Sequence, residues 1–352
     1  MKLTSFKYFP YELSFRNQFK TSTDTLKLRK VFIIELRDES GNSFWGEAAP
    51  LPQFHSESYD EVENELKKFS GKQVFECSNS LIELFGYVSS LTLLPTVRFA
   101  FEQVFMNCLL NHNINSSIDL PASKEINVNA LMGLSDFESS KRRIRQLISL
   151  GYNVIKLKTR DEDFYELYEL IAWVVGELNA KLKFRIDPNG SWDMEKTILR
   201  SKKLEYFPIE YIEQPVKEST DLINLSFDSP IPIAADESMR NIKDVDRLLA
   251  DSKIKFFVIK PMLFGGVQNI FKLSDMITDK NVNIIFSSSL ESNVGRRHLV
   301  LSSSIIDNNL AHGLGTSEMF TNQPTEDVFP VINGAINYSL NNYSSPITIN
   351  LK

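Results

Sequence analysis

Short apolar runs that each end in a charged residue recur through the middle of the chain. Asp187, Glu213 and Asp236 each follow directly after such a run, at intervals of 26 and 23 residues. That interval is the length of one strand plus one helix. We therefore predict consecutive strands of a parallel barrel, with functional side chains at their carboxyl ends.

Lysines stand on both sides of this acidic series. Lys156 and Lys158 lie in the apolar run before Asp187, and Lys260 ends the run after Asp236. Because side chains alternate along a strand, the first two lysines share one face, which we expect to be the barrel interior.

Further apolar runs complete the predicted barrel. Eight strands are expected between Ile126 and His312, which fits an abbreviated (β/α) barrel. Stretches of helical period separate them. The expected helices span 135–150, 163–178, 193–204, 243–249 and 266–276.

The N-terminal third lacks this rhythm. Residues 30–47 alternate as strand, glycine-containing turn and strand, which is typical of a hairpin. Helices are expected to begin near Ser58, with acids in the first turn, and at Pro95. We predict an α+β capping domain at 1–120, a catalytic barrel at 121–320, and a C-terminal segment, 321–352, that returns to the capping domain.

Composition narrows the range of functions. The chain has 352 residues, 42% of them hydrophobic, with a net charge of −6 and a pI near 5.5. No apolar run approaches the roughly 20 residues of a membrane span, and the start of the chain lacks the apolar core of a signal peptide. We expect a cytoplasmic protein without a nucleic-acid or membrane partner. A small anionic substrate is compatible with the charge, because a local metal and lysines can outweigh it.

Three carboxylates at neighbouring strand ends indicate a metal site. Asp187, Glu213 and Asp236 offer the oxygen ligands that Mg²⁺ prefers, with water and substrate oxygens completing the octahedron. The absence of neighbouring His or Cys disfavours Zn²⁺. We predict Mg²⁺, with Mn²⁺ as an alternative.

The flanking lysines suit proton transfer. A lysine acts as a base near neutral pH only when its pKa is lowered, by desolvation together with a nearby positive charge. We expect the Lys156 ammonium and a metal close to Lys158 to supply that charge. Lys260, on the other side of the acids, is placed to exchange a proton or to stabilise a planar anion. Such a site is suited to removing the proton next to a substrate carboxylate.

The order KxK, Asp, Glu, Asp, Lys resembles the enolase superfamily, in its muconate-lactonising-enzyme-like subgroup. Ser287 and Ser288 stand where the mandelate-racemase-like subgroup has a His. The surrounding motifs are similar to those of the o-succinylbenzoate synthase family. They are GEAAPLP at 46–52, DPNGSW at 187–192, YIEQP at 211–215, ADES at 235–238, KP at 260–261 and SSSLES at 287–292.

This resemblance implies a reaction. That family dehydrates 2-succinyl-6-hydroxy-2,4-cyclohexadiene-1-carboxylate to o-succinylbenzoate in menaquinone synthesis. By resemblance, Lys158 removes the proton α to the ring carboxylate and then protonates the departing hydroxide. Mg²⁺ on the three acids holds the enolate, and Lys260 stabilises it from the opposite face. Lys156 and Asn189 support the site.

The substrate tail is assigned by the same resemblance. Ser287, Ser288, Gly265 and Gly266 are expected to contact the succinyl tail. Residues 46–57 are expected to form a capping-domain loop that closes the pocket. The residues that bind the tail carboxylate stay open, as does the oligomeric state.

Two alternatives belong to the same subgroup. An N-acylamino acid racemase or a dipeptide epimerase would use Lys158 and Lys260 as opposed acid and base. Dipeptide epimerases typically carry an acidic pair after the eighth strand, and residues 313–316 have none. A non-catalytic barrel would need no such set of polar strand ends, and an unrelated phosphate-binding barrel would need a glycine-rich loop that is missing after the seventh and eighth strands.

Overall fold

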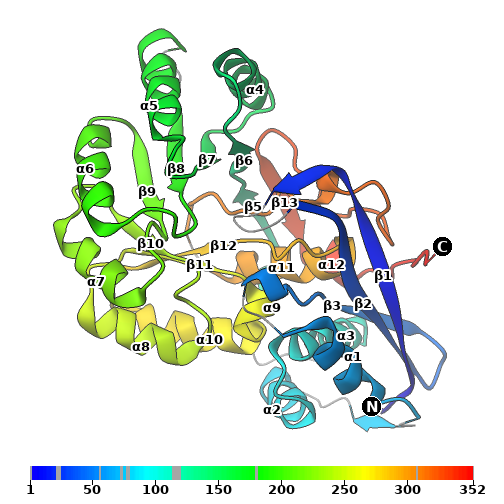
Figure 1. The fold of residues 1–352 in the computed structure, drawn as a ribbon. Coiled ribbons are helices and arrows are strands. Elements are labelled where there is room, and N and C mark those ends of the chain that lie inside the picture. The colour runs from blue at the N-terminus through cyan, green and yellow to red at the C-terminus, as the bar shows by residue number, and fades with distance from the viewer. Residues whose placement is uncertain are drawn as a thin grey trace.

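The computed structural model describes residues 2–20, 25–54, 57–71, 74–76, 80–112, 120–178, 181–306 and 308–351. Figure 1 shows an N-terminal α+β unit beside a curled parallel sheet whose strands are followed by helices. This architecture confirms the predicted fold class, a modified (β/α) barrel with an α+β capping domain.

The capping unit is an antiparallel sheet covered by helices. Its strand order is β3-β2-β1-β4, and β1 and β2 form a long hairpin. The predicted hairpin over 30–47 is confirmed as β2 and β3, which pair from Phe32–Ala48 to Arg37–Ser43. The elements are β1 Lys2–Lys20, β2 Thr25–Asp38, β3 Ser43–Ala48, α1 Tyr59–Lys67, β4 Phe75–Glu76, α2 Leu81–Leu91 and α3 Pro95–Asn111.

Local signals start these helices. Ser58 and Glu61 form a reciprocal capping box at α1, which satisfies two of the free N–H groups of its first turn. Pro95 occupies the first turn of α3, where its missing N–H costs nothing. Most residues of α3 are buried, because this helix lies between the capping sheet and the barrel.

The barrel sheet has seven parallel strands in sequential order, from β6 at one edge to β12 at the other. Helices follow the strands, as in βαβ units. The strands are β6 Ala130–Gly133, β7 Val154–Lys158, β8 Lys183–Asp187, β9 Ile209–Glu213, β10 Ile233–Ala235, β11 Phe256–Ile259 and β12 Asn283–Phe286. The helices are α4 Phe137–Ser149, α5 Phe164–Trp173, α6 Met194–Leu204, α7 Ser219–Asp228, α8 Ile242–Asp251, α9 Pro261–Phe264, α10 Val267–Ile277 and α11 Asn293–Ile305.

The structure corrects two details of the predicted barrel and gives the bounds of one more helix. The expected first strand is divided, because Ser123–Asn127 forms β5 and pairs with β13 (Ala335–Ser339) outside the barrel sheet. The expected eighth strand near His312 is reduced to single bridges from His312 to Val128 and from Gly313 to Ser287. Helix α7 lies between Glu213 and Asp236, where the spacing predicts a helix but gives no bounds.

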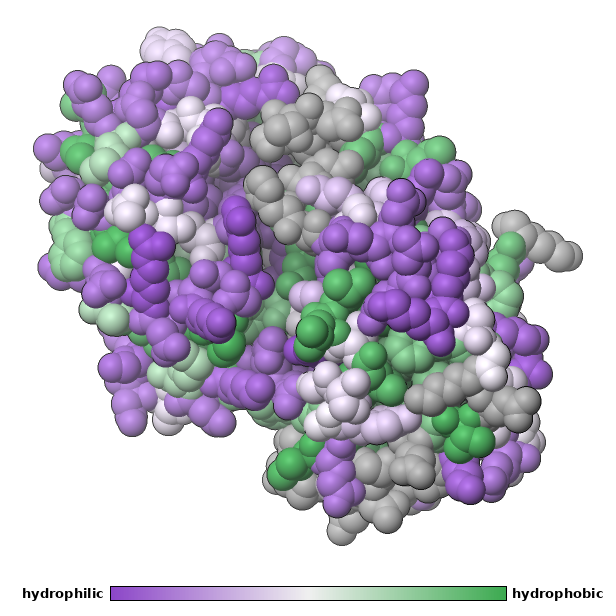
Figure 2. Space-filling model, turned by 60° about the horizontal axis from the view of Figure 1, so that its bottom comes forward, coloured by the Kyte–Doolittle hydropathy of each residue, from purple (hydrophilic) through white to green (hydrophobic). Residues whose placement is uncertain are grey.

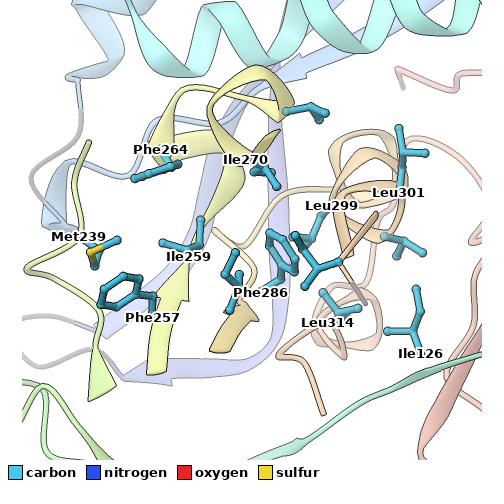
Figure 3. Close-up of a cluster of buried hydrophobic side chains, with 14 of the residues drawn as sticks. Ile126, Met239, Phe257, Ile259, Phe264, Ile270, Phe286, Leu299, Leu301 and Leu314 are labelled. Carbon is cyan, nitrogen blue, oxygen red and sulfur yellow. The ribbon is translucent and has the colours of Figure 1, made fainter. Parts of the chain in front are cut away.

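Apolar side chains fill the space between the strands and their helices. Figure 3 shows Phe257 and Ile259 of β11 and Phe286 of β12 close to Phe264 and Leu299 of the covering helices. All five side chains are buried in the main hydrophobic cluster. This packing fixes the strands whose ends carry the polar site.

Two buried carboxylates of the capping unit bind the N-termini of barrel helices. Glu47 of β3 accepts hydrogen bonds from the backbone N–H groups of Ser292 (2.9 Å) and Gly295 (2.8 Å) at the start of α11. Glu102 of α3 accepts one from Val267 N–H (2.6 Å) at the start of α10. Both acids are 0% exposed. Negative charge at a helix N-terminus is favourable, so these contacts fix how the two units are joined.

The C-terminal part of the chain contacts both units. Strand β13 pairs with β5, and the short helix α12 (Leu340–Ser344) follows it. Ile347, Ile349 and Leu351 then pack against the apolar cluster that contains Tyr11 and Leu13 of β1.

The face of the molecule in Figure 2 is mainly hydrophilic, with hydrophobic residues in small separate groups. None of the described helices combines the length and the apolar character that a membrane crossing requires.

Candidate active site

The predicted lysines and acids meet at the carboxyl ends of the barrel strands. Lys158 ends β7 and lies in register with Asp187, which ends β8. Glu213 ends β9, and Asp236 follows β10 by one residue. Lys260 directly follows β11. Parallel strands end at the same edge of a sheet, so residues from five successive strands converge.

The acids are buried and bind lysine ammonium groups. Asp187 and Glu213 are 0% exposed and Asp236 is 6% exposed. Lys156 Nζ lies 2.8 Å from Asp187 Oδ2 and 2.6 Å from Glu213 Oε1. Lys260 forms an ion pair with Asp236. Within the part of the chain that is described, no three Asp, Glu, His or Cys side chains are grouped as ready metal ligands.

The donor set nevertheless fits a divalent metal ion. Glu213 Oε2 and Asp187 Oδ2 are buried without a hydrogen-bond partner among the described residues, although Asp187 Oδ2 has ion pairs with Lys156 and Lys158. Buried, under-coordinated carboxylate oxygens are the ligands that hard divalent cations take. Asp187, Glu213 and Asp236 could hold such an ion once the lysine ammonium groups give way.

Opposite charges shift the pKa values of this cluster in both directions. Burial lowers the pKa of Lys156, but the charges of Asp187 and Glu213 outweigh burial and raise it well above its usual value. Burial would raise the pKa of Asp187, but the two lysines beside it hold that pKa at about 2. For Glu213 burial prevails and raises the pKa to about 8. Strong perturbation of several groups in one cleft is typical of functional sites.

Asn189 connects the base candidate to the acids. Its Oδ1 accepts a hydrogen bond from Lys158 Nζ (2.8 Å), and its Nδ2 donates to Glu237 Oε1 (3.0 Å). Its backbone is left-handed, with φ of 47°, and its N–H donates to Asp187 Oδ1 (3.1 Å). The structure thus gives the predicted supporting residue a positioning contact with Lys158. Glu237, which the sequence analysis did not select, is a second partner.

A cavity of about 660 Å³ opens in front of these residues. Lys156, Lys158, Asp236 and Lys260 line one end of it. Such a volume suits a small organic ligand. Among the predicted substrate contacts, Ser287 and Ser288 also line the cavity.

Gly265 and Gly266, which were predicted to contact the substrate tail, are not among the described residues that line this cavity. Gly265 ends α9 with φ of 94°, and Gly266 precedes α10 with φ of 95°. A side chain on Gly266 would lie 2.1 Å from Glu102 Oε2. The two glycines are therefore explained by the turn and by the close approach of Glu102.

The predicted closing loop reaches the cavity. Leu51 and Phe54 line it, and the Lys260 ammonium lies 5.2 Å from the centre of the Phe54 ring. His55 and Ser56, which belong to the same predicted loop, lie outside the described residues.

The far end of the cavity holds charged residues that the sequence analysis missed. They are Arg16 of β1, Arg143 of α4, and Glu318 in the short 3₁₀ turn after residue 316. All are ordinary surface residue types on elements without a motif, so no sequence signal separated them from solvated charges.

A buried acid next to the cavity-lining residue Leu290 should make stability depend on pH. Burial raises the pKa of Glu291 to about 7. The backbone N–H of Ser289 opposes this rise, because it donates a hydrogen bond to Glu291 Oε2 (2.6 Å). Because the pKa of Glu291 is higher in the folded state than its unfolded value of 4.5, its contribution to stability is fully present below pH 4.5. That contribution is lost as the pH rises through about 7, where the buried carboxyl must ionise. Glu291→Gln, which stays neutral, should therefore raise the free energy of unfolding at pH 8 by ~2 kcal/mol and change it little at pH 4.5.

Urea unfolding at both pH values measures this difference. Glu326→Gln, at an exposed position, is the matched control and should change neither value. Equal effects of Glu291→Gln at the two pH values would contradict the role given to burial.

Comparison with known proteins agrees with the geometry. The family described as Enolase C-terminal domain-like matches residues 139–340, and the family described as MenC, N-terminal domain matches residues 3–102. An o-succinylbenzoate synthase of Desulfotalea psychrophila is 24% identical over 342 residues, covering 88% of this chain and 93% of that protein.

Two solved structures share the fold. The MenC structure from Desulfotalea psychrophila superposes with a TM-score of 0.80 at 21% identity, covering 96% of this chain and 100% of the other. A dipeptide epimerase from Methylococcus capsulatus, complexed with Mg and the dipeptide L-Arg-D-Lys, gives 0.84 at 19% identity, covering 96% and 98%. The chain therefore belongs to the enolase superfamily, with an N-terminal domain of the MenC type.

Proposed function

We propose that this protein is an o-succinylbenzoate synthase, which dehydrates 2-succinyl-6-hydroxy-2,4-cyclohexadiene-1-carboxylate to o-succinylbenzoate in menaquinone synthesis. The observation that carries the proposal is the pair of lysines, Lys158 and Lys260, that line one cavity from strands on either side of the three acids. The synthase relatives and the MenC-type N-terminal domain support this activity over others of the superfamily.

The residues of this chain divide the reaction between them. Lys158, as a neutral amine oriented by Asn189, takes the proton from the ring carbon that bears the carboxylate. The resulting ammonium then gives that proton to the hydroxyl that leaves the neighbouring carbon. One C–H and one C–O bond break on the same face, water leaves, and the ring becomes aromatic.

Lys260 acts by its charge. It lies beside Asp236 and over the Phe54 ring, so its ammonium is held at the cavity. From there it stabilises the anionic form of the ring. A divalent ion, Mg²⁺ or Mn²⁺, held by Asp187, Glu213 and Asp236 supplies the positive charge that a carboxylate needs when its α-carbon loses a proton.

Removal of the metal tests this function directly. Purified protein should consume the cyclohexadiene substrate, followed by its absorbance, with Mg²⁺ or Mn²⁺. Turnover should fall at least ~100-fold in excess chelator and return when Mg²⁺ is restored, because the proton next to a carboxylate is very weakly acidic without a cation. Asp187→Asn should resemble the chelated enzyme at every Mg²⁺ concentration. Undiminished turnover in chelator, or none with Mg²⁺, would contradict the proposal.

A second candidate is an epimerase or racemase of the same subgroup. Opposed lysines suit removal of a proton from one face and its return to the other. Glu318 also lines the cavity after the region of the eighth strand, where an acid could bind the ammonium of a dipeptide. Deuterium exchange into N-succinyl amino acids and dipeptides decides between the two. Exchange faster than dehydration would favour this second function.

A further inference from the structure

The cavity that the lysines line is also lined by residues of α4 and of β1, outside the ring of strands. Strand β6 is an edge of the seven-stranded sheet, and the described residues record its pairing with β7 alone. On the other side the chain joins at Val128 and His312 and then departs toward Thr316. Beyond these bridges the cavity reaches α4 and β1, and Arg143, Tyr152 and Arg16 line its far end.

This far end has an excess of positive charge. Arg143 and Arg16 face one acid there, Glu318. Among the described residues, neither arginine has a carboxylate within salt-bridge distance, although Arg16 Nε donates to the backbone oxygen of Glu318 (3.3 Å). Burial raises the pKa of Tyr152, and the opposing influences of Glu318 and Arg143 on it place both charges close to that hydroxyl.

Arg143 is the better oriented of the two arginines. Its Nη1 donates to Gln146 Oε1 (2.7 Å), one turn further along α4, and Gln146 lines the same cavity. The helix itself is fixed by buried Ile144 and Leu147. Arg143 is exposed, and no further partner of its guanidinium is recorded among the described residues, so its remaining N–H groups can bind an anion as a bidentate pair.

A substrate with two carboxylates needs a cation at each end. The carboxylate next to the reacting carbon belongs with the acids, the metal and the lysines. We propose that Arg143, oriented by Gln146, binds the carboxylate at the end of the substrate's succinyl tail and so selects substrates with an anionic tail. This inference rests on the dehydration proposed above and names a specificity residue for it.

Steady-state kinetics of Arg143→Gln test the proposal. KM for the cyclohexadiene substrate should rise about 10- to 100-fold, the worth of one charged hydrogen bond, while kcat changes less than about threefold. Arg142→Gln is the matched control, since Arg142 is exposed on the same helix, contacts Ser139 and does not line the cavity. It should leave both constants unchanged, and Arg143→Lys should recover part of the KM.

A substrate whose tail carboxylate is a methyl ester separates recognition from a structural effect. Wild-type protein should show a raised KM for the ester, and Arg143→Gln should raise it no further. A full loss on the ester as well, or equal KM values for Arg143→Gln and Arg142→Gln, would overturn the proposal. A larger KM effect from Glu318→Gln than from Arg143→Gln would also overturn it, in favour of a cationic tail. Wild-type turnover reports on the dehydration itself, so its absence would identify failure of the proposed function.

Discussion

Lys158→Ala should lower kcat for dehydration by about 10³- to 10⁴-fold with little change in the free energy of unfolding. The large effect is expected because this one amine is assigned both proton transfers. Stability should change little, because Lys158 is partly exposed, donates one hydrogen bond, to Asn189, and lies 3.6 Å from Asp187, which keeps its closer ion pair with Lys156. The measurement is absorbance of the cyclohexadiene substrate at saturating Mg²⁺, together with urea unfolding.

Lys183→Ala provides the control for removal of a lysine from the barrel strands. Lys183 begins β8, and its ammonium pairs with Glu210 at the surface, away from the cavity. It should keep wild-type turnover. A Lys158→Ala protein with more than about a tenth of wild-type kcat would contradict the assignment of Lys158 as the base. Loss of folding in that variant would instead show a structural role.

Glu47→Ala should lower the free energy of unfolding by about 3–5 kcal/mol, because its removal leaves buried groups without partners. The carboxylate accepts bonds from the N–H groups of Ser292 and Gly295 and from the Ser292 hydroxyl, all inside the junction of the two units. Burial raises its pKa, and the nearby Arg29 opposes that rise. Urea unfolding at neutral pH measures the loss.

Glu47→Gln and Glu63→Ala complete that experiment. The glutamine amide keeps one acceptor oxygen, so Glu47→Gln should lower the free energy of unfolding by about half as much as Glu47→Ala, or less. Glu63 of α1 is partly exposed, pairs with Lys67 and accepts a long hydrogen bond from Tyr8 (3.4 Å), and its replacement should cost under about 1 kcal/mol. A cost for Glu47→Ala no greater than that of Glu63→Ala would contradict the role of Glu47 at the junction.

The barrel could be predicted because each strand is a short apolar run with a polar residue at its end. The division of the first strand could not, because Val128 and Asn129 continue the alternation of residues 126–131 without a break. Tertiary pairing with β13, some 200 residues later, decides where β5 ends. The eighth strand was expected from regular spacing, but the described structure holds only single bridges there.

The site was predictable in proportion to how much of it lies on strands. Lys156, Lys158 and the acids follow from alternation and spacing, and the structure brings them together. The lysines also form ion pairs with the carboxylates, which the spacing of these residues in the sequence does not predict. Arg143 lies on an amphipathic helix among other arginines, and only the path of the cavity distinguishes it from Arg142.

Glu102 and Glu47, which bind the N-termini of α10 and α11, limit which capping domains can be exchanged between related proteins. A chimera that joins this barrel to a foreign capping domain leaves the first turns of both helices unsatisfied unless the graft carries acids where Glu47 and Glu102 stand. Grafts that keep both acids should retain the junction, and with it the position of the hairpin over the cavity. New specificities are therefore more accessible through the tips of loops and hairpins than through replacement of the whole domain.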